Sequence, residues 1–89
     1  MHEATLVRGL TRTIDALARE HQARRVVRVK VSLGALSHLS PEHFREHFTL
    51  AAIGTLAESA HLDIETASDV DDPHAQDIVL RGIDVEVGP

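Results

Sequence analysis

The sequence predicts an α/β (α+β) two-layer sandwich, a three-stranded mixed sheet with two helices on one face and the element order α-β-α-β-β. Three observations lead to this fold class. Apolar residues recur at three- and four-residue steps from Ala4 to about Gln22, which is typical of an amphipathic helix. Valines alternate with charged residues in VVRVKVSL, as in a strand with one buried face. A length of 89 residues, 43% of them hydrophobic and 26% charged, suits one globular domain spanning 1–89.

The first helix and the first strand should each bury one face. The helix is expected to bury Leu6, Leu10, Ile14, Leu17 and His21. The strand is expected to bury Val27, Val29, Val31 and Leu33, with Arg28, Lys30 and Ser32 on its other face. Gly34 then weakens the alternation.

Ser40-Pro41-Glu42 predicts the start of a second helix. The serine hydroxyl can accept hydrogen bonds from unpaired amides of the first turn, and proline at the first helical position loses no hydrogen bond. The inner face of this helix is expected to comprise Phe44, Phe48, Ala51 and Ala52. Gly54 suits its carboxyl end.

Two further strands are predicted after residue 60. Leu62 and Ile64 alternate with acidic residues, and a third strand covers 77–87. The apolar residues of this last strand change parity, which predicts a bulge near Arg81-Gly82. The first strand, second helix and second strand should form a parallel crossover unit. The last two strands should form a hairpin around the polar loop SDVDDPHAQD, residues 68–77.

Composition excludes several classes of function. The formal net charge is -5 and the chain contains no cysteine, tyrosine or tryptophan, which disfavours nucleic acid and anionic membranes as partners and excludes disulfides. The one basic cluster is better explained as solvated charges at a strand edge; it comprises Arg24, Arg25, Arg28 and Lys30. No catalytic motif, signal peptide or membrane span is evident, so we expect a cytoplasmic protein that is not an enzyme.

Histidine is the residue type that suggests chemistry, with seven in the chain. His43 and His47 lie four apart on the second predicted helix, so they can share a face and bind a metal. His38 lies in the loop leading to that helix and can approach such a site. Two half-exposed surface histidines are the simpler interpretation of the 43/47 pair, because Phe44 and Phe48 take the inner face.

His2 stands beside the amino terminus. The amine of Met1, the amide and imidazole nitrogens of His2 and the amide nitrogen of Glu3 can surround one ion in a plane. Four nitrogens in a square suit Ni(II), and also Cu(II). On the dipeptide alone, the simpler interpretation is that His2 is a terminal residue with no role.

The wider sequence resembles the HypA/HybF hydrogenase-maturation family. The similarity rests on the initial MHE, the strand ending in LGALS at 33–37, the Pro41-Glu42 helix start and the segment GTLAESA at 54–60. Members of that family are nickel metallochaperones and not enzymes. They deliver nickel, together with a HypB-like maturation GTPase, to the large subunit of [NiFe] hydrogenase, and some also serve urease. The resemblance implies that Met1, His2 and Glu3 form the nickel site.

One departure from the family is large. Family members carry a zinc module with two Cys-x-x-Cys pairs between the last two strands, whereas this chain has only residues 68–77 there. No zinc is therefore expected. A naturally shortened paralogue and an engineered deletion are both compatible with this pattern.

Two functions stay open. The first is a nickel-binding accessory protein, metallochaperone-like, for [NiFe] hydrogenase maturation. The second is a repurposed interaction or assembly subunit of a hydrogenase system that carries no transferable metal. An open edge of the third strand would also allow pairing into a homodimer.

Overall fold

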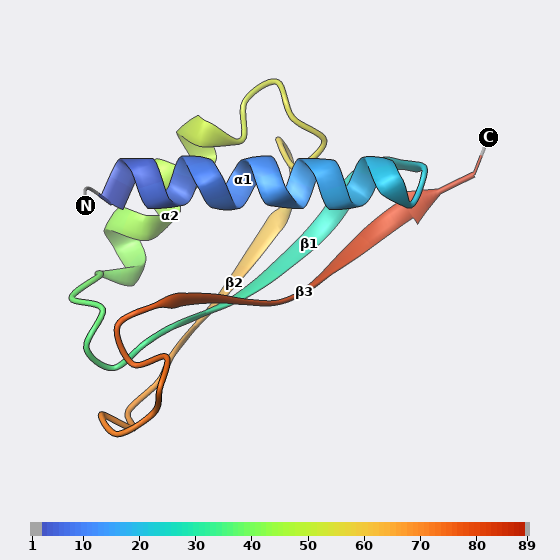
Figure 1. The fold of residues 1–89 in the computed structure, drawn as a ribbon. Helices are drawn as coiled ribbons and strands as arrows, with labels where there is room; N and C mark the ends of the chain where they lie inside the picture. Colours follow the sequence, from blue (N-terminus) through green and yellow to red (C-terminus); the bar gives the residue numbers. More distant parts are fainter. Residues whose placement is uncertain (1–2, 89) are drawn as a thin grey trace.

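The structure is a computed structural model that describes residues 3–88, in which two helices lie on one face of a sheet (Figure 1). The elements in chain order are α1 (Glu3–Glu20), β1 (Ala23–Leu33), α2 (Pro41–Ala51), β2 (His61–Thr66) and β3 (Ile78–Val87). The fold class and the element order are thus confirmed. No helix within residues 3–88 is long and apolar enough to cross a membrane.

The central strand of the sheet is β1, because the strand order is β2-β1-β3. Its pairing with β2 is parallel, from Arg28 opposite His61 to Leu33 opposite Thr66, which confirms the crossover unit. Its pairing with β3 is antiparallel. The predicted hairpin between β2 and β3 is therefore wrong. The physical reason is the length of the strands. The 11-residue β1 can form hydrogen bonds along nearly all of the 10-residue β3, whereas the six-residue β2 would leave part of β3 unpaired.

The residues that α1 buries lie on a face displaced around the helix from the predicted one, with Ile14 common to both. The fully buried residues are Val7, Thr11, Ile14 and Ala18. Leu6 is 39% exposed, and His21 is exposed beyond the end of the helix. The small side chains of Thr11 and Ala18 allow close packing, and the Thr11 hydroxyl donates to the Arg8 carbonyl at 2.9 Å, so its burial leaves no unpaired donor.

Two of the three register shifts between β1 and β3 bear on the predicted burial and on the predicted bulge. In β1 the register passes from Val26 opposite Val85 to Arg28 opposite Asp84, so that Val27 is an extra residue. The buried set is consequently Val26, Val29, Val31 and Leu33, and the predicted burial of Val27, which is 39% exposed, is wrong. In β3, Arg81 is the extra residue between the partners of Lys30 and Val31. The predicted bulge near Arg81-Gly82 is confirmed.

The second helix begins as predicted. Ser40 has an extended backbone, its hydroxyl accepts from the His43 amide at 3.5 Å, and Pro41 is the first helical residue. Phe44 and Phe48 are buried with their ring centroids 6.2 Å apart. The inner face is completed by Ala52, which is buried, and Ala51, which is half-buried.

The basic cluster lies on the central strand and not at an edge of the sheet, which corrects that detail of the prediction. The cations concerned are Arg24, Arg25, Arg28 and Lys30. Arg28 pairs with Asp63 at 2.6 Å across to β2 and with Asp84 at 3.8 Å across to β3. The hydrogen bond from Arg28 lowers the pKa of Asp63 below its ordinary value. Because neighbouring carboxylates neutralise the cluster, the interpretation as solvated structural charges is supported.

Asp15 joins α1 to the segment that follows α2. Its Oδ1 accepts from the Leu56 amide at 2.8 Å, while the Leu56 carbonyl accepts from the Val26 amide at 2.8 Å. Leu56 therefore links α1, through Asp15, to β1, through Val26. The hydrogen bond from the Leu56 amide, followed by that from the Arg19 side chain, lowers the pKa of Asp15 below its ordinary value.

The loop between β2 and β3 crosses the end of β1. The Gly34 amide donates to the Asp77 carbonyl at 2.9 Å, and the Leu36 amide donates to the Ala75 carbonyl at 2.6 Å. A Cβ at Gly34 would overlap the Ala75 carbonyl and lie 2.6 Å from the His74 carbonyl oxygen. This close approach explains the glycine.

Substitution of Asp15 should destabilise the fold in a pH-dependent way. Asp15→Ala leaves the Leu56 amide without its acceptor and should cost about 1 to 3 kcal/mol at pH 7. Because the folded pKa is lowered, the ionised carboxylate stabilises fully above the unfolded pKa, and this contribution is lost as pH falls through the folded pKa. The free energies of unfolding of the parent and of Asp15→Asn, measured by urea denaturation, should differ at pH 7 and converge in acid. A difference that does not change with pH would contradict this.

Substitution of Gly34 should disturb the loop. Gly34→Ala forces the loop backbone away from β1 and should cost about 1 to 3 kcal/mol. Gly82→Ala is the matched control, because nothing lies within 4 Å of a Cβ built at Gly82. Thermal or urea denaturation should separate the two variants, and equal stability would show that the loop yields without strain.

Candidate metal site

The predicted nickel site lies at the start of α1. Met1 and His2 fall outside the described residues, and Glu3 is the first residue of the helix. The first four amides of an α-helix have no carbonyl partner within the helix. The Glu3 amide can therefore bind an ion without the loss of a helical hydrogen bond.

Packing of α1 against α2 brings the side chain of Glu3 to His47. The Oε2 atom of Glu3 lies 3.7 Å from the Nε2 atom of His47. This oxygen is buried and has no hydrogen-bond partner among residues 3–88, although the whole Glu3 side chain is 20% exposed. The His47 side chain is 43% exposed. A buried carboxylate oxygen and an accessible imidazole nitrogen thus face each other without a direct hydrogen bond.

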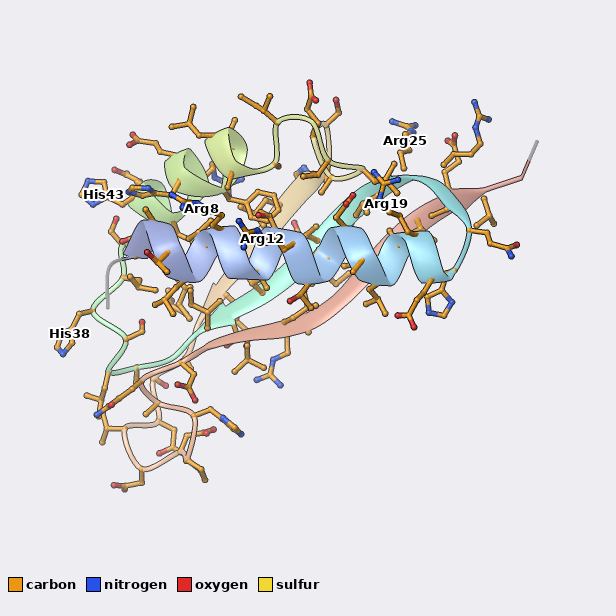
Figure 2. The ribbon with its side chains drawn as sticks, turned by 45° about the horizontal axis from the view of Figure 1, so that its top comes forward. Arg8, Arg12, Arg19, Arg25, His38 and His43 are labelled. Atoms are coloured by element: carbon orange, nitrogen blue, oxygen red, sulfur yellow. The ribbon has the colours of Figure 1, made fainter. Side chains whose placement is uncertain are left out.

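The other two histidines proposed as ligands lie elsewhere on the surface. His43 is exposed on α2, and His38 is exposed on the preceding loop, as Figure 2 shows. His38 has a φ of 59°, a left-handed conformation that is uncommon outside glycine. Within residues 3–88, no three His, Cys, Asp or Glu side chains converge on one point. Of the predicted ligands within residues 3–88, Glu3 and His47 are the two that the fold brings together.

A groove opens beside the Glu3–His47 pair. It has a volume of about 300 Å³ and is lined by Ala4, Arg8, His47, Leu50 and Ala51. Leu50 is 69% exposed and Ile53, just beyond α2, is 62% exposed. The accessible side of His47 therefore faces an open, partly apolar surface.

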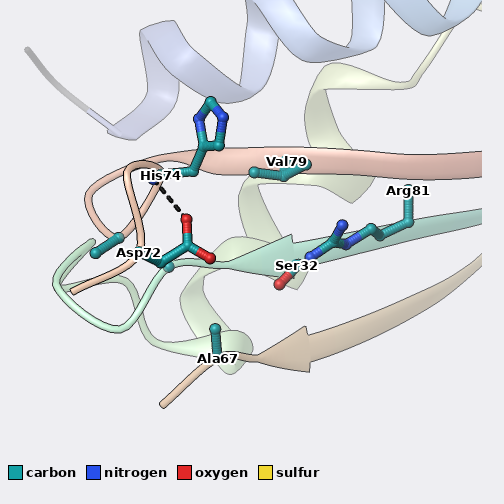
Figure 3. A pocket seen from close by; sticks show the side chains of 8 residues that line it. Ser32, Ala67, Asp72, His74, Val79 and Arg81 are labelled. Carbon is teal, nitrogen blue, oxygen red and sulfur yellow. Dashed lines mark hydrogen bonds between the residues drawn. The ribbon is translucent and has the colours of Figure 1, made fainter. Parts of the chain in front are cut away.

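A second cavity lies beneath the loop between β2 and β3 (Figure 3). Its volume is about 100 Å³, and its lining includes Ser32, Asp72, His74 and Arg81. The His74 amide donates to Asp72 Oδ1 at 2.7 Å, and His74 Nδ1 lies 3.1 Å from Asp77 Oδ2. These are bonds within a turn, which supports the reading of this acidic loop as a solvated connection.

Solved structures share this architecture. The solution structure of the Ni metallochaperone HypA from Helicobacter pylori matches with a TM-score of 0.82 at 19% identity, covering 99% of this chain and 100% of that chain. A second solution structure, of a HypA protein, matches with a TM-score of 0.65 at 20% identity, covering 96% and 92% of the two chains. The fold is thus the two-layer α/β fold found in a nickel metallochaperone.

Sequence comparison identifies the family. The family model described as hydrogenase/urease nickel incorporation, metallochaperone, hypA matches residues 1–70. Hydrogenase maturation factor HypA of Chlorobium limicola is 45% identical over 65 residues, 73% of this chain and 56% of that protein. The corresponding protein of Acidithiobacillus ferrooxidans is 39% identical over 66 residues, 74% of this chain and 58% of that protein. The chain belongs to the HypA family.

The extent of the matches is itself informative. The matched segment makes up little more than half the length of these curated relatives. The family model ends at residue 70, so it includes Met1, His2 and Glu3 but not β3. The predicted nickel ligands therefore lie in the part of the chain that is recognisably HypA.

Sequence reasoning missed the contact between Glu3 and His47. Helical periodicity placed His43 and His47 together, whereas the packing of two helices distinguishes them and brings only His47 to Glu3. No spacing in the sequence joins residues 3 and 47. The signal lies in the tertiary structure alone.

Proposed function

We propose that this chain is a nickel-binding accessory protein for [NiFe] hydrogenase maturation, with the nickel held by Met1, His2 and Glu3. The observation that carries the proposal is the position of Glu3 as the first residue of α1, with an amide that needs no helical partner. The family match over residues 1–70 supports the same assignment.

The proposed donors suit a d8 ion. The Met1 amine, the His2 amide and imidazole and the Glu3 amide supply four nitrogens, and Ni(II) accepts four nitrogens in a plane. Both amides and the amine must lose protons before they bind, so nickel affinity should fall in mild acid. The role is to hold and release an ion, and no catalytic step is needed.

Transfer requires a protein that exchanges ligands with this site. We propose the hydrogenase large subunit or a HypB-like GTPase in the cytoplasm, because the relatives are named hydrogenase maturation factors. In this proposal residues 1–89 act as one HypA-like nickel-binding domain, and 68–77 replace the zinc module. The attachment of this loop to β1 through Gly34 and Leu36 supports that substitution, and the absence of cysteine leaves no thiolate site for zinc.

A second function is a HypA-like interaction or assembly subunit without transferable metal. Exposed Leu50 and Ile53 at the end of α2 favour it, since they provide apolar contact area. In addition, β2 and β3 each have one edge unpaired within residues 3–88. Pairing across the β3 edge would give a homodimer, and light scattering that shows a monomer at all concentrations would count against it.

Nickel titration of the tagless protein tests the main proposal. The parent should bind about one nickel per chain, whereas His2→Ala should lose binding because the planar set loses its imidazole. A variant with extra residues before Met1 should also lose binding, because its free amine is displaced. Isothermal titration calorimetry and equilibrium dialysis measure the stoichiometry.

Two outcomes would contradict the proposal. If the parent and both variants bind nickel alike, the ligands lie elsewhere in the chain. If none of the three binds nickel, the metal-free interaction subunit becomes the better account.

A further inference from the structure

We propose that the cavity beneath the loop between β2 and β3 binds inorganic hydrogen phosphate, a small oxyanion that retains a proton. In this complex Arg81 and Ser32 donate hydrogen bonds to the phosphate oxygens, and Asp72 accepts the phosphate proton. The cavity lies on the face of the sheet that the helices do not cover, so this inference is independent of the proposed nickel site.

Ser32 is buried although it faces away from the helices. Its neighbours along β1, Val31 and Leu33, belong to the core, so the alternation of the strand turns Ser32 to the other face of the sheet. The loop covers Ser32 there, because Gly34 allows the Ala75 carbonyl to approach closely. Only 2% of Ser32 is exposed, and its hydroxyl lines the cavity without a hydrogen-bond partner among residues 3–88. A ligand can therefore use this hydroxyl without breaking a bond of the protein.

Arg81 supplies the positive charge of the cavity. It is the extra residue of the bulge in β3, and its side chain lines the cavity together with Ser32. Figure 3 shows the guanidinium extending toward Ser32. Within the described part of the chain no carboxylate forms an ion pair with it, including Glu65, which lies opposite Ser32 on β2. A guanidinium group binds oxyanions through parallel N–H donors, so Arg81 has its full donor set available.

Asp72 determines which anions fit the cavity. Its Oδ1 accepts from the His74 amide at 2.7 Å, and its Oδ2 has no partner among residues 3–88. The imidazole of His74, which also lines the cavity, has its Nδ1 3.1 Å from Asp77 Oδ2. A carboxylate repels a fully ionised oxyanion but accepts a hydrogen bond from an anion that retains a proton. Phosphate retains at least one proton at neutral pH and sulfate retains none, so the cavity should prefer phosphate.

The size of the cavity suits a free ion. Its volume is about 100 Å³, which corresponds to about three waters at about 30 Å³ each. This space accommodates an ion of five heavy atoms but not a nucleotide. A bound phosphate connects β1, β3 and the loop through Ser32, Arg81 and Asp72, and it should stabilise the folded chain in proportion to its occupancy.

Phosphate titration of the metal-free protein tests this inference, with amide NMR spectra recorded at constant ionic strength. The parent should bind one phosphate per chain, with saturable shifts at Ser32, Arg81 and residues 72–75. Sulfate should bind at least about tenfold more weakly, because it has no proton to donate to Asp72. Glycerol 3-phosphate should also bind more weakly than phosphate, because the cavity has no room for its organic part.

Three variants and one control assign the contacts. Arg81→Gln should weaken phosphate binding at least about tenfold, because it removes a charged donor. The matched control Arg12→Gln removes the same charge from the exposed side of α1 and should bind like the parent (Figure 2). Ser32→Ala should weaken binding about three- to tenfold, the effect of one neutral hydrogen bond. Asp72→Asn keeps the oxygen that accepts from the His74 amide and should reduce the preference for phosphate over sulfate, because its amide donates to either anion.

Three outcomes would overturn the inference. The first is an absence of saturable shifts in the parent up to about 20 mM phosphate, well above a millimolar dissociation constant. The second is equal affinity for phosphate and sulfate. The third is an Arg81→Gln variant that binds phosphate like the parent. Amide spectra recorded without phosphate establish that each variant is folded, and none of these results bears on nickel binding at residues 1–3.

Discussion

Burial of one face of β1 is the constraint on which the rest of the molecule depends. This strand pairs on both sides. Its buried face is the surface against which α1 and α2 pack, and it comprises Val26, Val29, Val31 and Leu33. Pairing on both sides gives the backbone amides and carbonyls of this central strand their hydrogen-bond partners. Ile14 of α1 and Phe44 of α2 pack into the core with this face. The contact between the two helices places Glu3 beside His47. The candidate site is thus a consequence of core packing.

Much of the fold could be predicted from the sequence, because local signals and tertiary structure agree. The Ser40-Pro41 start, the amphipathic first helix and the parity change near Arg81 each follow from short-range rules, and each is present. The failures concern choices that local patterns do not contain. A bulge at Val27 reverses the parity of β1, and the partner of β3 depends on the relative lengths of β1 and β2.

The candidate site also has one part that local sequence predicts and one that it does not. The nitrogens of Met1, His2 and Glu3 are adjacent in the sequence, so their joint chemistry could be predicted without a structure. The approach of His47 to Glu3 could not be predicted, since helical periodicity treats His43 and His47 as equivalent. Only the approach of α1 to α2 distinguishes them, and it leaves His43 in solvent.

The two ends of the loop between β2 and β3 are fixed by consecutive residues of β1 and the turn that follows it. The Leu33 carbonyl accepts from the Ala67 amide at 2.9 Å, and the Gly34 amide donates to the Asp77 carbonyl at 2.9 Å. These two hydrogen bonds close the loop at its base, and residues 68–74 within it are exposed. A loop closed in this way tolerates a change of length, because the entropy cost of closing a longer loop grows slowly with its length. The loop between Ala67 and Asp77 can therefore lengthen or shorten while β1 keeps its pairing with β2 and β3.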